Sequence, residues 1–212
     1  MKRTLIVLGG DKPKAKFLQE LAAKCDYTIC ADKGLEAAFE AGISVDEALG
    51  DFDSASPETV AEMRRRGIPN TVYPSVKDDT DGMAATRIAV QKGAEEVWFA
   101  GACGGRIDHY VAGFQLLIFC EKHGVKAKIA EEDMEIFAVQ GEKRICGKKG
   151  ELLSVIQMSE DCEVSESGVF YPLDHHKMEW GVPLGVSNVL TEDIATITVH
   201  RGWALLIHYF HP

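Results

Sequence analysis

The sequence contains no apolar run that approaches the roughly 18–20 residues needed to cross a bilayer. Its first residues, Met1 to Arg3 followed by Thr4 to Leu8, hold too short an apolar stretch for a signal peptide. None of its six cysteines form the C-x-x-C pairs typical of zinc or redox sites. We expect reduced thiols in a core, with a disulfide or zinc framework as the less favoured alternative. These absences predict a cytoplasmic chain without membrane spans.

An excess of basic residues is also missing. The chain has 23 lysines and arginines against 33 aspartates and glutamates, a net charge of −10, and neither half is positive. Because nucleic acids and anionic membranes bind basic faces, this charge counts against broad binding to either. A hydrophobic content of 46% over 212 residues is instead typical of a globular protein with one larger domain or two small ones.

The first part of the chain alternates short apolar runs with amphipathic stretches. Strands are expected at Thr4–Leu8, Tyr27–Ala31, Thr71–Tyr73 and Val97–Ala100. Helices are expected at Lys14–Lys24, Leu35–Glu40, from Ser56-Pro57 to Gly67, Thr80–Lys92 and His109–His123. This alternation predicts an α/β domain with a mainly parallel sheet that is covered on both faces.

After about residue 126 the pattern changes to short strands separated by Gly, Asp and Pro turns. The expected strands are Glu135–Val139, Lys143–Cys146, Leu152–Gln157, Cys162–Ser165, Gly168–Tyr171 and Ala195–Val199, the last joined through an Arg201-Gly202 hairpin to Trp203–Phe210. Such a run predicts an all-β sandwich or barrel. We therefore expect two domains, residues 1–126 and 127–212.

Aspartates cluster where strands of the first domain are expected to end. The three loops are Gly50-Asp51-Phe52-Asp53-Ser54, Lys77-Asp78-Asp79-Thr80-Asp81 and Gly104-Gly105-Arg106-Ile107-Asp108-His109. Because the carboxyl ends of parallel strands share one edge of the sheet, these loops should converge on one crevice.

Several carboxylates close together repel one another unless a cation compensates their charge. Oxygen ligands of this kind suit Mg²⁺ held together with phosphate groups. Glycine-flanked N–H groups at helix starts and the guanidinium of Arg106 would meet the phosphates. Although each aspartate alone could simply cap a helix, the three loops together favour chemistry on a magnesium–nucleotide complex.

Several motifs occur in order along nearly the whole chain: Ala31-Asp32, Gly50-Asp51-Phe52-Asp53-Ser54, Asp78-x-Thr80-Asp81, Gly105-Arg106-x-Asp108-His109, Ser167-Gly168-x-x-Tyr171-Pro172-Leu173 and Gly185-Val186-Ser187-Asn188. Each motif alone is weak, but their order is specific and resembles that of the thiamine pyrophosphokinases. The resemblance implies a homodimer with shared active sites, an N-terminal catalytic domain that binds nucleotide and metal, and a C-terminal β-sandwich for thiamine binding and dimerisation. It also implies transfer of a pyrophosphoryl group from ATP to thiamine.

The resemblance further assigns expected roles to residues of this chain. Those around the Mg²⁺ and the triphosphate are Asp51, Asp53, Asp78, Asp81 and Asp108 as metal ligands, with Arg106 on the phosphates. Further nucleotide contacts are expected from Asp32, Lys77, Thr80, Gly104 and Gly105. Thiamine contacts are expected from Asp81, Tyr171, Ser187 and Asn188, with Tyr171 supplied by the partner subunit.

Two positions depart from the family pattern, and two other readings stay open. Lys33 stands where the family commonly has glycine, and Lys77 where it often has glutamine. Asp51-Phe52-Asp53 also fits the nucleophile motif of aspartate-dependent phosphohydrolases. A nucleotide sensor without turnover would need only the first domain.

Overall fold

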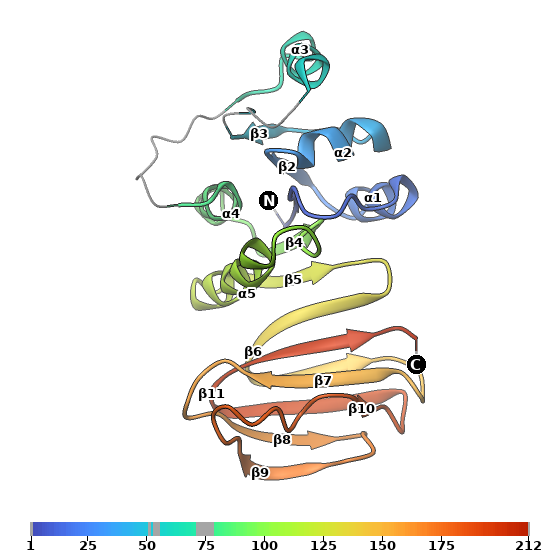
Figure 1. Ribbon diagram of the computed structural model, residues 1–212, viewed down its shortest axis with the longest axis vertical. Coiled ribbons are helices and arrows are strands. Elements are labelled where there is room, and N and C mark those ends of the chain that lie inside the picture. Colours follow the sequence, from blue (N-terminus) through green and yellow to red (C-terminus); the bar gives the residue numbers. More distant parts are fainter. Residues whose placement is uncertain (1, 51, 53–55, 71–78, 212) are drawn as a thin grey trace. The chain divides into compact units, whose positions relative to one another are not determined.

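The computed structural model describes residues 2–50, 52, 56–70 and 79–211 (Figure 1). These residues belong to two compact units, residues 1–132 and 133–212. Asp51, Asp53, Lys77 and Asp78 lie outside the described residues, as does the strand expected at Thr71–Tyr73.

The described residues of the N-terminal unit form five parallel strands: β1 Arg3–Val7, β2 Tyr27–Ala31, β3 Glu47–Leu49, β4 Glu96–Ala100 and β5 Lys126–Ala130. Their spatial order is β5-β4-β1-β2-β3. The chain builds the sheet outward from β1 through β2 to β3, and then continues on the other side of β1 with β4 and β5. The helices that follow β1 and β4, which are α1 Ala15–Ala22 and α5 Ile107–Lys122, therefore lie on opposite faces of the sheet, which leaves a crevice at the carboxyl ends of these strands.

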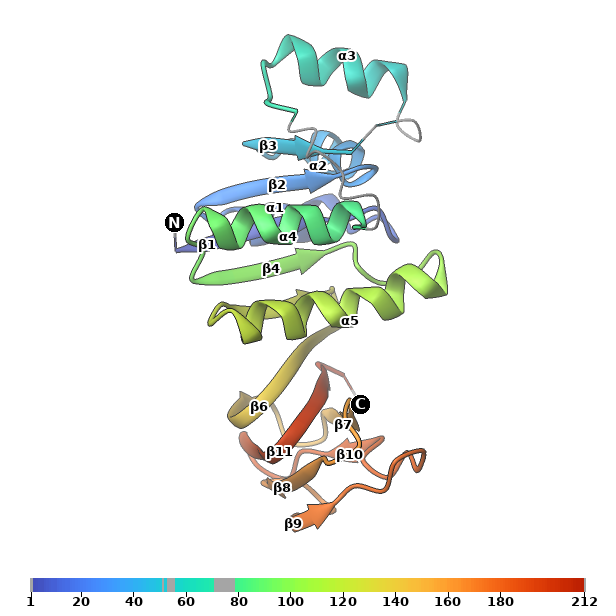
Figure 2. The ribbon, with the colours of Figure 1, turned by 90° about the vertical axis from the view of Figure 1, so that its left-hand side faces the viewer.

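Helices cover both faces of this sheet, as the alternating pattern predicted. The helices are α1 Ala15–Ala22, α2 Gly34–Ala41, α3 Pro57–Arg65, α4 Asp81–Gln91 and α5 Ile107–Lys122. Helices α1 and α2 pack together on one face, and α4 and α5 pack together on the other (Figures 1 and 2). Strands β1, β2 and β4 are buried at all but their first residue, because both of their faces lie under helices.

Local signals placed several of these elements correctly. Strand β2 has the predicted bounds, and the Ser56 side chain caps α3 by accepting a hydrogen bond from the Thr59 N–H at 3.1 Å. Strand β5 was missed in the sequence, although it pairs in parallel with β4 along four residues. The boundary between the compact units therefore follows Glu132 rather than residue 126.

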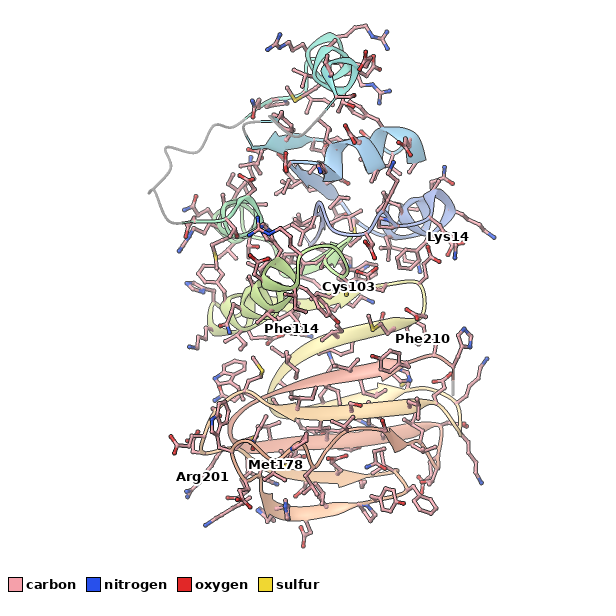
Figure 3. The ribbon with its side chains drawn as sticks, in the orientation of Figure 1. Lys14, Cys103, Phe114, Met178, Arg201 and Phe210 are labelled. Carbon is pink, nitrogen blue, oxygen red and sulfur yellow. The ribbon has the colours of Figure 1, made fainter. Side chains whose placement is uncertain are left out.

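The C-terminal unit is antiparallel. Its strands are β6 Met134–Cys146, β7 Leu152–Gln157, β8 Glu163–Ser167, β9 Leu173–Lys177, β10 Asn188–Val189 and β11 Ile194–Tyr209. Strand β11 pairs with β6, β7 and β8, while β9 extends from β8 and β10 from β7. Buried Val155, Val164, Ile197 and Leu206 form the centre of its core, into which Met178 also packs (Figure 3).

The hairpin expected at Arg201-Gly202 is wrong. Strand β11 runs through this pair, and its residues on both sides of it pair with β6. The register changes between Val199 and Ala204, and Gly202 has a φ of 72°. The glycine therefore accommodates an irregularity that bends a continuous strand, instead of reversing the chain.

Two further strand assignments need correction. Glu135–Val139 and Lys143–Cys146 are parts of the single strand β6, which passes through Gly141 at a φ of 85°. Gly168–Tyr171 is not a strand, since only Val169 forms an isolated bridge, to Leu190. Short apolar runs do not reveal whether a glycine between them bends a strand or ends it.

All six cysteines lie within the described residues and none of them forms a disulfide bond, and three of them are buried: Cys30, Cys120 and Cys162. Burial raises the pKa of the Cys120 thiol to about 12. Within the described ranges, no helix has both the length and the apolar character required to traverse a bilayer.

Candidate active site

A cavity of about 390 Å³ lies in the N-terminal unit where β1, β2 and β4 end. The loop Leu8–Gly10 follows β1, Asp32 and Lys33 follow β2, and Gly101–Arg106 follows β4. The starts of helices α4 and α5 complete its wall with Asp81 and His109. This is the place at which a sheet with this strand order binds its ligand.

Six residues predicted from the sequence line this one cavity: Asp32, Thr80, Asp81, Gly104, Gly105 and Arg106. They come from loops that are far apart in the chain, after β2, before α4 and after β4. The parallel sheet thus brings together the acidic and glycine-rich motifs that lie within the described residues.

Close backbone contacts hold the β1 and β4 loops together. The Gly10 N–H donates to the Gly101 carbonyl at 2.8 Å, and a Cβ added at Gly10 would lie 2.4 Å from the carbonyl oxygen of Cys103 (labelled in Figure 3). Gly104 has a φ of 75°, and a Cβ there would meet the carboxylate of Asp11 at 2.0 Å. Larger residues would therefore separate the two loops, so glycine is required for the shape of the cavity.

Arg106 and Asp108 form an ion pair at the start of α5. The Arg106 Nε donates to Asp108 Oδ1 at 3.1 Å, and a second guanidinium nitrogen bonds Oδ2. Hydrogen bonds from Arg106 hold the pKa of the Asp108 carboxyl below its usual range. Both side chains are more than half exposed, so a phosphate group can compete for the guanidinium at little cost.

Helix α5 begins without a side-chain cap. Arg106 occupies the cap position with an extended backbone, and an arginine side chain has no acceptor with which to cap the first turn. The Asp108 carboxylate accepts the His109 N–H at 3.0 Å, so this N–H group is not among the donors offered to an anion. Helix α4 differs, because Thr80 Oγ1 accepts the Met83 N–H at 3.2 Å. The start of α5 therefore offers N–H groups and the positive end of a helix dipole to an anion.

Two non-glycine residues of the N-terminal unit have left-handed backbone conformations, and one of them, Asp32, lines the cavity. Asp32 has a φ of 47° and lies at the end of β2, where its N–H donates to the Leu49 carbonyl. Phe52 has a φ of 55°, and its ring is buried in the core of the unit. Such conformations cost about 1–3 kcal/mol and often occur where a loop must present a functional group.

The expected thiamine contacts in the C-terminal unit fall into two classes. Tyr171 is 67% exposed, and Ser187 is also exposed. Asn188 is only 6% exposed, and its amide is hydrogen-bonded within the protein. Tyr171 and Ser187 are thus accessible to a ligand, whereas Asn188 lies beneath the surface.

The described carboxylates fit the donor chemistry of a hard cation. Asp32 and Asp81 line the cavity, and carboxylate oxygens are the ligands that Mg²⁺ prefers. No three acidic, histidine or cysteine side chains converge on one point within the described ranges. Three of the five expected ligands, Asp51, Asp53 and Asp78, lie outside those ranges.

Other residues of the cavity wall were not assigned to the site from the sequence, among them Gly9, Gly10, Lys33 and His109. The glycine pair directly after the first strand was a usable signal, because glycines at that position admit a ligand close to the backbone. Lys33 was noted only as a departure from a family pattern. Its position in the wall depends on the pairing of β2 with β1.

A parallel sheet with helices on both faces, and a cavity of glycines and carboxylates at its carboxyl edge, is typical of α/β proteins that bind phosphorylated ligands. Comparison with known families identifies the class more closely. Residues 18–129 match the model of the thiamin pyrophosphokinase catalytic domain, and residues 138–203 match that of the thiamin pyrophosphokinase vitamin B1 binding domain.

Relatives along the whole chain agree with these matches. The thiamine pyrophosphokinase of Bacillus subtilis is 30% identical over 210 residues, which are 98% of each chain. A crystal structure of the Bacillus subtilis thiamine pyrophosphokinase has a TM-score of 0.87 at 28% identity, covering 98% of this chain and 99% of that one. Thiamin pyrophosphokinase from Candida albicans shares the fold, with a TM-score of 0.85 at 18% identity over 98% of this chain and 90% of its own. This chain belongs to the thiamine pyrophosphokinase family, which confirms the resemblance of its motifs.

Proposed function

We propose that this protein transfers the pyrophosphoryl group of ATP to the hydroxyl group of thiamine, which yields thiamine diphosphate and AMP. The observation that carries the proposal is the cavity at the carboxyl edge of the parallel sheet, lined by Asp32, Asp81 and Arg106. Both halves of the chain match family models, one for catalysis and one for vitamin B1 binding.

In this proposal the cavity holds the triphosphate. The N–H groups of the Gly104-Gly105 loop and of the uncapped start of α5 would bind phosphate oxygens. Arg106 would exchange its bond to Asp108 for one to phosphate. Lys77 and Thr80 are proposed to make further nucleotide contacts near the start of α4.

Aspartates would hold the Mg²⁺ that accompanies ATP. The proposed ligands are Asp51, Asp53, Asp78, Asp81 and Asp108. A bound Mg²⁺ supplies charge neutralisation for the phosphate oxygens. Among the described ligands, Asp81 is exposed at the first residue of α4, so its carboxylate is accessible from the cavity.

The chemical step then depends mainly on positioning and charge. The thiamine hydroxyl attacks the β-phosphorus in line, the bond to the α-phosphate oxygen breaks, and AMP leaves with that oxygen. One of the aspartates accepts the hydroxyl proton. Arg106 would stabilise the charge that accumulates on the phosphate oxygens.

We propose that thiamine binds against Tyr171 supplied by the partner subunit, with Ser187 as a polar contact, and that Asp81 carries the negative charge that faces its cationic ring. The exposed Tyr171 ring packs edge-on against Phe170, with centroids 4.8 Å apart, which limits its motion. A flat cation on an aromatic face gains about 0.5–2 kcal/mol. We propose that the C-terminal unit is a β-sandwich that contributes this contact.

We further propose a homodimer in which the C-terminal unit forms the interface. An apolar hollow on this unit is surrounded by exposed Trp180, Val182, Leu184 and Val186. Contiguous exposed apolar side chains of this kind mark protein interfaces. Trp180→Glu should therefore shift the protein toward monomers in sedimentation, whereas His211→Glu, a change at an exposed residue near the chain end, should not.

Product analysis tests the reaction directly. Incubation with ATP, Mg²⁺ and thiamine should form AMP and thiamine diphosphate in equal amounts, with no release of free phosphate. ADP as the stoichiometric product would instead identify an ordinary kinase, and free phosphate without thiamine would favour a hydrolase.

A further inference from the structure

Glu166 is a buried glutamate for which the proposed reaction has no use. It lies on β8 opposite Ile197 of β11, and it is only 3% exposed. Burial raises the pKa of its carboxyl to about 7. Its Oε1 atom has no hydrogen-bond partner among the residues that the structure describes. A carboxyl group kept in a core at such a desolvation cost calls for an explanation.

Within the described residues, the Glu166 side chain hydrogen-bonds to Asn188 alone. The Asn188 Nδ2 donates to Glu166 Oε2 at 3.2 Å and to the Tyr171 carbonyl at 2.9 Å. The Asn188 Oδ1 accepts the N–H groups of Tyr171 and Val189, each at 3.0 Å. An amide side chain has two N–H donors and two acceptor lone pairs. All four are used inside the protein, so none remains for a ligand.

These bonds hold the main chain of Tyr171 on both sides. Upstream of it, the Phe170 N–H donates to the Val189 carbonyl at 2.9 Å, and Val169 bridges to Leu190. The Asn188 amide continues this short ladder by one residue, because it pairs with both the N–H and the carbonyl of Tyr171. The ring of Tyr171 projects outward from this anchored backbone and is 67% exposed.

Glu166 adds a buried anchor to the Asn188 amide. With the amide reversed, its NH₂ group would meet the two donating N–H groups of Tyr171 and Val189, and its oxygen would meet Glu166 Oε2 and the Tyr171 carbonyl. The three backbone contacts therefore already favour the observed orientation. An acceptor at Glu166 adds the fourth contact, and it is the only one of the four supplied by another side chain.

We propose that Glu166 and Asn188 are positioning residues that hold Tyr171 in place for thiamine, and that Asn188 acts through Tyr171 without touching thiamine itself. The first part gives Glu166 a role in substrate binding. The second changes the role expected for Asn188 from a contact to a support. The link to thiamine rests on the proposed function, whereas the support of the Tyr171 backbone does not.

The test uses the full-length protein and three glutamate variants. Glu166→Gln keeps an oxygen acceptor in the same place, whereas Glu166→Met fills the space without one. Glu163→Gln is the matched control, because Glu163 lies on the same strand but on its other face, where it bonds His175 at 2.8 Å. Thermal unfolding first establishes that each variant is folded at the assay temperature.

Hydrogen exchange of the Tyr171 amide tests the support without any ligand. In Glu166→Met the exchange rate at Tyr171 should rise by about tenfold or more, because the NH₂ group of Asn188 loses one of its two acceptors and the amide holds Tyr171 less firmly. Glu166→Gln and Glu163→Gln should exchange as the wild type does. Unchanged protection of Tyr171 in folded Glu166→Met would overturn the proposal. If that variant does not fold, Asn188→Ala replaces it with the same expectation.

Kinetics test the link to thiamine. Glu166→Met should raise the KM for thiamine by roughly 3–10-fold while the KM for ATP stays within about twofold, and Glu166→Gln should restore the wild-type value. In a Tyr171→Ala background, Glu166→Met and Asn188→Ala should add little further change in the thiamine KM. Fully additive effects would contradict action through Tyr171 and would place Asn188 in direct contact with thiamine.

Hydrogen exchange and kinetics distinguish a failure of the proposed function from a failure of the proposed support of Tyr171. Wild-type protein that forms no AMP with thiamine would refute the proposed function, while the exchange result would still decide the support of Tyr171. Normal thiamine turnover together with an unaffected thiamine KM in Tyr171→Ala would refute the link between the support of Tyr171 and thiamine binding.

Discussion

In the N-terminal unit, loops after parallel strands and the starts of two helices surround the cavity, whereas in the C-terminal unit one amide side chain holds the segment that carries Tyr171. The first arrangement follows from strand order, which brings the ends of β1, β2 and β4 together. The second depends on two buried polar residues, Glu166 and Asn188. A site built from backbone geometry therefore depends most on glycines and charges. A site built from side chains depends on individual hydrogen bonds.

Asp81 gives the largest expected effect in the N-terminal unit. Asp81→Asn should lower kcat/KM by at least ~100-fold, since the variant loses electrostatic stabilisation of about 3 kcal/mol. The matched control is Asp79→Asn, which removes only the exposed bond from Arg87 at 2.8 Å. Steady-state kinetics on both variants measure the difference. Equal losses in the two would show that the position of the charge is irrelevant.

The next largest expected effect is a pH-dependent change in the free energy of unfolding, caused by Glu166 in the C-terminal unit. The pKa of Glu166 in the folded protein, about 7, lies above its ordinary value of about 4.3. The neutral form is therefore favoured by folding, and this stability is present at low pH and is lost as the pH rises through 7. Relative to Glu166→Gln, the wild type should lose about 3 kcal/mol of unfolding free energy between pH 5 and pH 8.

Denaturant titrations of both proteins at several pH values measure this loss. Glu163→Gln controls for the loss of a surface carboxylate, and its difference from wild type should stay within about 0.5 kcal/mol. Parallel pH profiles for the wild type and Glu166→Gln would show that Glu166 ionises normally in the folded protein.

Gly10 tests whether the cavity depends on backbone contact. A methyl group at Gly10 would meet the carbonyl oxygens of Cys103 and Gly101 at 2.4 and 2.5 Å, so Gly10→Ala should destabilise the protein by about 2 kcal/mol and weaken ATP binding. Gly113 also lines the cavity, but in Gly113→Ala the new methyl group would make only an ordinary contact with Ile129 at 3.8 Å. That helical position should gain up to about 1 kcal/mol instead. Thermal unfolding compares the two variants, and equal midpoints would contradict the close approach of the loops.

The smallest expected effect is the change in the KM for ATP when Lys33 is replaced. Its side chain starts in the cavity wall, and no ion pair of Lys33 occurs in the part of the chain that the structure describes. Lys33→Ala should raise the KM for ATP by about 2–5-fold without changing the KM for thiamine, because an exposed cation contributes about 0.5–1 kcal/mol to phosphate binding. Lys16→Ala, on exposed helix α1, is the control. A change in the KM for thiamine alone would place Lys33 away from the phosphates.

The amino-acid sequence was enough to predict the α/β class of the first unit, the strand-rich second unit, and the motifs that mark the family. These features depend on local periodicity and on residues next to one another, such as the Ser56 cap and the strand Tyr27–Ala31. The membership of Asp32, Thr80, Asp81 and Arg106 in one cavity was also predictable, since the ends of parallel strands meet at one edge.

Features that depend on pairing between distant segments could be recognised only in the folded protein. Strand β11 continues through Gly202 because both of its halves find partners in β6, which no local pattern can reveal. Asn188 lies beneath Tyr171 because β10 pairs with β7, and Glu166 is buried because β8 pairs with β11. Gly9, Gly10 and Lys33 enter the cavity wall through the order of the strands in the sheet. Burial and hydrogen-bond partners are properties of the packed chain, so the distinction between a residue that contacts a ligand and one that supports it is made only there.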